Sequence, residues 1–249
     1  PHLIVNLVEL IKYVKIQVNF MAAKNRWFVR LAFWLFMLYI YLTVYSRGGT
    51  YSFLLLNTFL GYLPIELSFH LKYQQNKFVF GLIFILWLLF YPNAPYVLTD
   101  LFHLAKLDPY NSATGLMEFN LHLWLNFSNL VASALACSLV GIWSVEYVTD
   151  QLLIKLQHFS RKWQFLTISI LLLLSSVGIY VGRFLRLHTA YLFLDPNWVL
   201  QQLVDMWSPR MLIFVGFMFI IQLIMWIVIF ISRLSLQNTE KMLTSVKPN

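Results

Sequence analysis

Charged residues are scarce in this sequence. Asp, Glu, Lys and Arg make up 11% of the 249 residues, whereas soluble proteins carry about 25%. Hydrophobic residues reach 60% and the mean hydropathy is +0.70. Because a chain this apolar cannot hide its large side chains inside one soluble core, we expect a lipid bilayer to be the solvent for most of it.

Cysteines and the motifs of common enzymes are also missing. Cys137 is the single cysteine, so a disulfide within the chain is excluded. The sequence has no P-loop, dinucleotide-binding glycine motif, nucleophile elbow or diagnostic zinc motif. The net charge of +8 does not predict a nucleic-acid partner, because the basic residues flank apolar segments and form no stripe.

Long apolar segments are what the sequence has instead. A membrane-crossing helix needs about 20 apolar residues, and the length allows about six such helices with short loops. We predict spans over Trp27–Tyr45, Tyr51–Leu71, Phe78–Tyr91, Phe119–Tyr147, Trp163–Gly182 and Met211–Ser232. The predicted fold class is therefore an all-α, multi-pass integral membrane protein of the cell membrane, with membrane lipids as partners.

Two amphipathic segments accompany these spans. Residues 1–23 place lysines opposite an apolar face, which is typical of a helix that lies in the membrane interface. A helix packed on a partner protein would show the same pattern. Asp195 and Pro196 mark the start of an outer amphipathic helix before the last span. We predict one polytopic domain over residues 24–236 and a cytoplasmic tail over residues 237–249.

The positions of Lys and Arg predict the orientation. With the N-terminus on the inside, 13 of the 18 Lys and Arg residues fall in inside segments and 5 in outside segments. Cytoplasmic segments carry such an excess of positive charge. We therefore predict that both termini are cytoplasmic and that Pro92, His103 and Arg183 lie toward the extracytoplasmic side.

The third predicted span is interrupted. It has 14 residues before Pro92, which cover about 21 Å and do not reach across a hydrocarbon core of about 30 Å. A break at membrane depth must be buried in protein or line a wet cavity. Asn93 is predicted to cap a new helix, one face of which carries Tyr96, Asp100 and His103. Such broken or re-entrant helices hold binding sites in transporters, although an ordinary proline kink would look similar.

A line of polar residues follows the fourth predicted span. Its members recur every three or four residues and share one helical face: Glu118, His122, Asn126, Asn129 and Ser133. Polar residues within a span face the bundle interior. The line therefore predicts either the lining of a polar cavity or hydrogen bonds that hold neighbouring helices together.

Two further groups of residues point to ligands. Arg183 and Arg186, at the outer end of the fifth span, could grip a phosphate or carboxylate or extend to lipid headgroups. The pairs Asp100–His103 and Glu118–His122 each have a spacing that puts an oxygen and a nitrogen ligand on one helical face. A divalent metal held by Asp100, His103 and His122 is therefore one alternative cofactor.

Two motifs resemble those of a known family. The residues from Tyr91 to Leu104, Tyr-Pro-Asn-Ala-Pro-Tyr-Val-Leu-Thr-Asp-Leu-Phe-His-Leu, resemble the signature of a bacterial multi-pass membrane family, domain-of-unknown-function family 1361. Gly178 to Arg186 is similar to its second signature, after which this chain departs from the family pattern and so resembles a divergent member. The resemblance implies the membrane fold and the two motifs. It implies no mechanism, because the family has no agreed activity.

Three functions remain open at this point. The first is a non-enzymatic protein that binds or passes an anionic or lipid-linked small molecule in an extracytoplasmic polar cavity. The second is an intramembrane hydrolase or transferase, with or without a metal, that acts on a lipid-linked substrate. The third is a structural or assembly subunit with a membrane-protein partner. The predicted ligand-binding residues are Asn93, Tyr96, Asp100, His103, Glu118, His122, Arg183 and Arg186.

Overall fold

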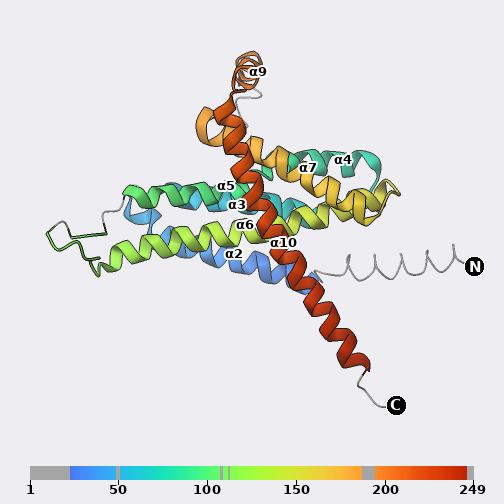
Figure 1. Ribbon diagram of the computed structural model, residues 1–249, viewed down its shortest axis with the longest axis horizontal. Helices are drawn as coiled ribbons and strands as arrows, with labels where there is room; N and C mark the ends of the chain where they lie inside the picture. Colours follow the sequence, from blue (N-terminus) through green and yellow to red (C-terminus); the bar gives the residue numbers. More distant parts are fainter. Residues whose placement is uncertain (1–22, 49–50, 107–108, 112, 187–193, 246–249) are drawn as a thin grey trace, which may run out of the picture.

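The computed structural model describes residues 23–48, 51–106, 109–111, 113–186 and 194–245 (Figure 1). Within these ranges the chain is helical, apart from turns, loops and one isolated bridge between Tyr110 and Met117. The prediction of an all-α fold is thereby confirmed for the described residues. Nearly all of the predicted N-terminal amphipathic helix lies outside them.

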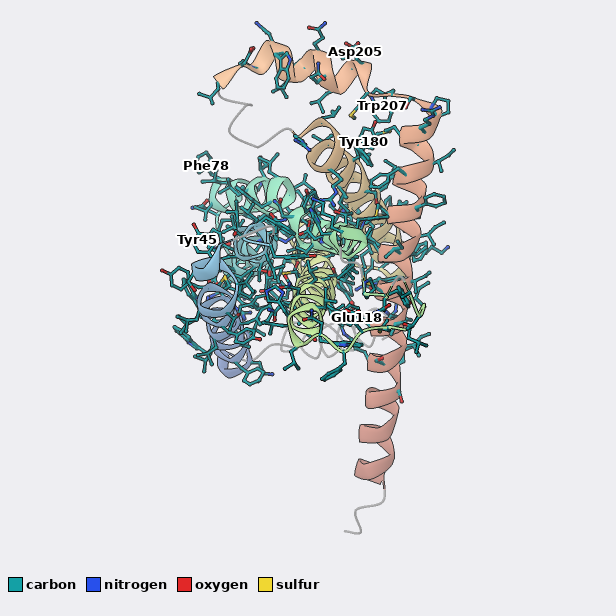
Figure 2. The ribbon with its side chains drawn as sticks, turned by 90° about the vertical axis from the view of Figure 1, so that its left-hand side faces the viewer. Tyr45, Phe78, Glu118, Tyr180, Asp205 and Trp207 are labelled. Atoms are coloured by element: carbon teal, nitrogen blue, oxygen red, sulfur yellow. The ribbon has the colours of Figure 1, made fainter. Side chains whose placement is uncertain are left out.

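The helices follow one another with short connections. In chain order they are α2 (Ala23–Thr43), the 3-10 turn η1 (Tyr45–Arg47), α3 (Phe53–His70), α4 (Lys77–Phe90), α5 (Asn93–Tyr96), the 3-10 helix η2 (Val97–Lys106), α6 (Leu121–Lys155), α7 (Arg161–Tyr180), the π-helical turn η3 (Val181–Leu185), α9 (Pro196–Asp205) and α10 (Pro209–Ser245). In Figure 1, α2, α3 and α6 lie side by side, and α10 crosses them at a steep angle. The 37-residue α10 is slightly longer than the 35-residue α6, and Figure 2 shows that it extends beyond the other helices of the bundle.

Polar side chains cap several helix starts. The Asn76 side chain accepts a hydrogen bond from the Val79 amide at 2.8 Å, at the start of α4. Asn120 and Ser160 cap α6 and α7 in the same way. Asp195 caps α9, and the following proline takes the first helical position. The start of the predicted outer amphipathic helix is therefore confirmed.

Five helical stretches are long and apolar enough to cross a membrane: Asn25–Thr43, Lys77–Lys106, Leu121–Lys155, Arg161–Leu185 and Pro209–Ser235. The 18-residue α3 is not among them, because Asn57 and Glu66 lower its hydropathy. Yet α3 runs beside α2 and α6, and its polar groups bond to those of other helices. A sixth span through α3 stays a prediction.

Contacts at both ends of α3 define the two ends of the bundle. Near its start, the Tyr51 hydroxyl donates to the carbonyl of His103 at 3.3 Å. Near its finish, the Arg26 guanidinium donates to the carbonyl of Phe69 at 2.9 Å. We call the end of the bundle with the Tyr51–His103 contact the Asp100 end, after the buried acid of η2. The opposite end, where Lys155 closes α6, is called the Glu146 end.

An ion pair fastens α2 to α3 toward the Glu146 end. The Arg30 guanidinium donates to both carboxylate oxygens of Glu66, at distances of 2.6 to 3.1 Å. The Tyr62 hydroxyl donates to the same carboxylate at 2.5 Å, and a ring nitrogen of His70 lies 2.9 Å from it. These bonds explain how an acid is tolerated on α3.

The interruption predicted at Pro92 is present. The α-helix α4 ends at Phe90, and the chain continues through the short α5 into the 3-10 helix η2. In Figure 1 these pieces lie end to end along the bundle. A 3-10 helix has three residues per turn, so Asp100 and His103 remain aligned. Whether the segment is re-entrant stays a prediction.

Three glycines on the surrounding helices make room for the break. A Cβ atom on Gly178 of α7 would lie 2.6 Å from Pro92 Cγ, and one on Gly141 of α6 would lie 2.7 Å from Ala94 Cβ. A Cβ on Gly61 of α3 would lie 3.2 Å from the Cγ2 atom of Val97, the first residue of η2, and 2.9 Å from the Sγ atom of Cys137 on α6. The backbone around Pro92 is therefore packed inside protein, which is what lipid surroundings demand of irregular backbone.

Candidate functional site

Asp100 is the centre of a buried polar cluster at the Asp100 end. Its side chain is 1% exposed. The Asn57 amide of α3 donates to Oδ2 at 2.7 Å, and Arg183 Nη1 donates to Oδ1 at 3.2 Å. Asp100 thus joins η2 to α3 on one side and to the end of α7 on the other.

Arg183 lies in the π-helical turn η3 and makes three bonds to the broken helix. Besides Asp100, it donates to the Tyr96 hydroxyl at 3.2 Å and to the Thr99 carbonyl at 2.8 Å. Its guanidinium carbon lies 5.6 Å from the centre of the Tyr96 ring. A π-helical turn inserts an extra residue and is frequent at functional sites. Here it rotates Arg183 toward η2.

The Asp100–Arg183 pair is a charge pair in a low-dielectric setting. Both partners are hydrogen-bonded to further groups, which is what makes a buried pair tolerable. The Arg183 side chain is 21% exposed, whereas that of Asp100 is almost fully enclosed. The acid is therefore an internal partner, and the arginine alone reaches the surface.

His103 lies beside this cluster and takes no part in its ion pair. Its Nδ1 atom is 3.0 Å from the Asp100 carbonyl, within η2 itself. The imidazole ring packs on the Phe53 ring with centroids 4.3 Å apart. The structure thus brings together Tyr96, Asp100 and Arg183, with His103 on the α3 side of η2.

Arg186 is exposed and has no partner among the described residues. Its φ of 52° places the backbone in the left-handed region. A residue with a Cβ atom seldom adopts this conformation, and such residues concentrate at functional sites. The turn ends the helical run of α7 and η3. The two arginines that were predicted to bind one anion therefore differ in their surroundings. Arg183 is bonded to η2, whereas Arg186 is exposed.

Asn93 has a different role from the predicted one. Pro92 occupies the cap position of α5, and no side chain caps that helix. The Asn93 amide instead donates to the carbonyl of Phe90 at 3.0 Å. It therefore satisfies an acceptor left open at the end of α4, because the Ala94 amide, which would bond to Phe90 in a continuous α-helix, donates to the Tyr91 carbonyl instead.

Glu118 is not part of the polar line on α6. The helix begins only at Leu121, so Glu118 lies in the preceding loop, where its carboxylate accepts from the Asn111 amide at 2.9 Å. The prediction that Glu118 and His122 share a helical face was therefore wrong. The Asn120 cap shows why: an asparagine that accepts from the His122 amide starts the helix two residues too late for Glu118.

The rest of the polar line is present and mostly buried. His122 is exposed, and its Nδ1 atom lies 3.1 Å from the Asn126 amide. Ser133 shares a hydrogen bond of 2.6 Å with Thr58 of α3. Asn129 is 3% exposed, and its amide nitrogen has no partner among the described residues. The line therefore includes one contact between helices and one unsatisfied donor.

The predicted metal ligands do not meet. Among the described residues there is no group of three or more His, Cys, Asp and Glu side chains that could hold a metal ion. Asp100 bonds to Arg183 and Asn57, and His122 lies at the exposed start of α6. A metal cofactor stays an untested prediction.

An apolar groove opens between α2 and α3. Its volume is about 630 Å³, and its lining comprises Trp34, Met37, Leu38, Tyr41, Tyr45, Ser52, Phe53, Leu55, Leu56 and Phe59. Phe53 also packs on His103, which places one end of the groove at the Asp100 end. Such a groove fits an apolar chain rather than a polar solute.

Sequence reasoning missed important polar residues. Asn57 was overlooked, although an asparagine inside an apolar segment signals a buried partner. A second buried cluster at the Glu146 end, which contains Glu146 and Asp150, was missed because α6 was expected to end at Tyr147. The helix continues to Lys155. The signal was available, since acids four residues apart share a helical face.

The model of a family described as a protein of unknown function, DUF1361, matches residues 56–225. The match contains both motifs of the site, the broken helix around Pro92 and the turn with Arg183. No curated protein and no solved structure matches the chain.

Proposed function

The chain belongs to the DUF1361 family of proteins of unknown function, and we propose that it binds the anionic group of a small or lipid-linked molecule at the Asp100 end of its membrane domain. The proposal rests on the hydrogen bonds and the partial exposure of Arg183. Protein acceptors hold its guanidinium in place, yet about a fifth of the side chain, 21%, is exposed.

Such an arginine is suited to anions. A guanidinium has five N–H donors in a planar fork, which matches the oxygens of phosphate and carboxylate. Asp100, Tyr96 and the Thr99 carbonyl take up three hydrogen bonds and fix its orientation. A ligand bound to the remaining donors would not have to order a flexible side chain first, and this lowers the entropic cost of binding.

Arg186 supplies the second positive charge. It is exposed, lies three residues beyond Arg183 and has no partner among the described residues. Asp100 is enclosed and already paired, so it does not cancel the charge of Arg186. The excess of positive charge at this turn favours an anion over a cation.

The groove between α2 and α3 offers a place for the apolar part of a lipid-linked ligand. It reaches the same end of the bundle and holds about 630 Å³. An acyl or isoprenoid chain in this groove would keep its charged group at the Asp100 end. This arrangement favours a lipid-linked anion over a freely soluble one.

The proposal includes a topology. We propose six crossings with α3 as the second, both termini in the cytoplasm and the Asp100 end on the extracytoplasmic side. The excess of Lys and Arg in the segments that would be cytoplasmic supports it. Under this topology the ligand is met outside the cytoplasm.

Ligand-dependent stabilisation of the full chain in nanodiscs tests the function. The probes are inorganic phosphate in zwitterionic nanodiscs and phosphatidylglycerol in place of part of the zwitterionic lipid. We expect one of them to raise the thermal unfolding temperature. Stabilisation by phosphate identifies a free anion, and stabilisation by phosphatidylglycerol alone identifies a lipid-borne one.

Arg186→Ala is the informative variant, and Arg210→Ala is its control. Arg210 is also exposed, at the second residue of α10 and at the same end. Loss of a charge-assisted hydrogen bond costs about 1.5–3 kcal/mol, so Arg186→Ala should weaken binding roughly 10- to 100-fold. Arg210→Ala should leave it unchanged. Equal behaviour of the two variants, or no stabilisation by either probe, would contradict the proposal.

A further inference from the structure

The second half of α6 carries two buried acids at the Glu146 end. Glu146 is 2% exposed and Asp150 is 4% exposed. They lie one helical turn apart and therefore on the same face. Every residue from 141 to 150 is buried, so water does not surround this face. Two carboxyl groups thus share a protein interior.

The two acids have different partners. Arg233 of α10 donates to Glu146 Oε1 at 2.5 Å, and its side chain is 12% exposed. Asp150 Oδ1 instead accepts from the Gln164 amide of α7 at 2.6 Å. The Gln164 oxygen in turn accepts from Arg161 at 3.4 Å. The direct partner of Glu146 is therefore a cation, whereas the direct partner of Asp150 is a neutral amide.

We propose that this carboxyl pair is a proton-binding site, in which Glu146 is ionised against Arg233 and Asp150 carries an exchangeable proton. Two like charges one turn apart in a low-dielectric interior repel strongly, so that one of them is neutralised. Asp150 takes the proton because an amide stabilises a negative charge less than an arginine does.

The groups that face the pair agree with this assignment. Glu146 interacts electrostatically with Arg161 of α7 and Arg233 of α10, and the Trp226 side chain of α10 also faces it. Asp150 interacts with the same two arginines and with Gln164. Arg161 is exposed, and water screens its charge more than that of Arg233. One well-enclosed positive charge therefore serves two acids.

Buried polar atoms without a hydrogen-bond partner are a second observation at this site. Thr149 is fully buried, and its hydroxyl has no partner among the described residues. It follows Glu146 by three residues and so lies on the same side of α6. The amide nitrogen of the neighbouring Gln151 is likewise buried and unpaired within the described part of the chain. Unpaired donors beside buried acids suit a place where protons or water enter.

The site also has a short route to water. Asp150 lies five residues before Lys155, the last residue of α6, which corresponds to about 7.5 Å along the helix. His158 and Arg161, just beyond that end, are exposed. The pair therefore lies close to the surface at the Glu146 end and far from the Asp100 end.

Infrared spectroscopy of the full chain in nanodiscs tests this inference. We expect the carbonyl band of a protonated carboxyl group at neutral pH and its loss at alkaline pH. Asp150→Asn should abolish the band, and it keeps the oxygen that accepts from Gln164. Asp205→Asn, which changes an exposed acid at the end of α9, should leave the band unchanged. A wild-type protein without the band at neutral pH would overturn the proposal, as would a band that survives in Asp150→Asn.

A measurement on the unaltered protein guards against misfolding of the variant. Dicyclohexylcarbodiimide reacts with protonated carboxyl groups in apolar surroundings. Peptide mass spectrometry should find Asp150 modified at neutral pH, with modification falling as the pH rises, and Glu146 should remain unmodified. Preferential modification of Glu146, or modification of neither acid, would count against the assignment.

Discussion

The contact between α7 and the broken helix supports a sharp prediction about stability. Gly178→Ala would place a Cβ atom 2.6 Å from Pro92 Cγ and 2.8 Å from Pro92 Cβ. Carbon atoms pack at about 3.5–4.0 Å, so α7 or the break must shift by about 1 Å. The proline ring cannot rotate away, because its φ is locked.

The expected magnitude follows from two opposing effects. Overpacking a tight contact costs about 1–3 kcal/mol. Replacing Gly by Ala inside a helix contributes about 0.5–1 kcal/mol of stability. Gly216 of α10 provides the matched control, because a Cβ atom there meets nothing within 4 Å. Both variants gain the helical contribution, so it cancels when they are compared. Gly178→Ala should therefore be less stable than Gly216→Ala by the cost of overpacking, about 1–3 kcal/mol.

Reversible unfolding in mixed detergent micelles measures this difference. Gly81→Ala on α4, also without neighbours within 4 Å, serves as a second control. Gly141→Ala should behave like Gly178→Ala, since its Cβ would lie 2.7 Å from Ala94 Cβ. If Gly178→Ala proves as stable as Gly216→Ala, the break is not packed against α7, and the reasoning about its burial fails.

Other changes test individual contacts by the same unfolding measurement. Arg183→Gln leaves Asp100 buried without a cation and should cost about 3–5 kcal/mol; adding Asp100→Asn should recover most of this loss, and additive losses would contradict the pairing. Arg30→Ala removes the bidentate bonds to Glu66 and should cost about 1.5–3 kcal/mol, with proteolysis of the α2 region as a second readout. Asp195→Ala removes the cap of α9 and should cost about 1 kcal/mol locally; a global change in hydrogen exchange would contradict a capping role.

The break around Pro92 shows how far sequence can predict the site. The short run before the proline indicated an interruption that had to be buried, and the three glycines that bury it lie on α3, α6 and α7. Sequence spacing also grouped Tyr96 with Asp100 correctly. It could not show that the Asn93 amide donates to the carbonyl of Phe90. An asparagine side chain has both an acceptor, which could cap the following helix, and a donor, which can bond to an earlier carbonyl.

The limits of helix α6 decided two further outcomes. Its start at Leu121 removed Glu118 from the polar line, and its end at Lys155 brought Asp150 into the bundle. Helix ends depend on capping and on what packs around the last turns, which local hydropathy does not report. Both errors arose at the ends of a correctly predicted helix.

The sequence by itself determined the solvent of this protein, its helical class and the places where polar groups interrupt apolar runs. These properties follow from local composition and spacing, since a bilayer accepts only segments that satisfy their own backbone. Only the tertiary structure decided which charges meet. Arg183 and Asp100 are separated by more than eighty positions, |i−j| = 83, and are joined at 3.2 Å by a π-helical turn. Pairing across such a distance depends on how helices pack, which no local pattern encodes.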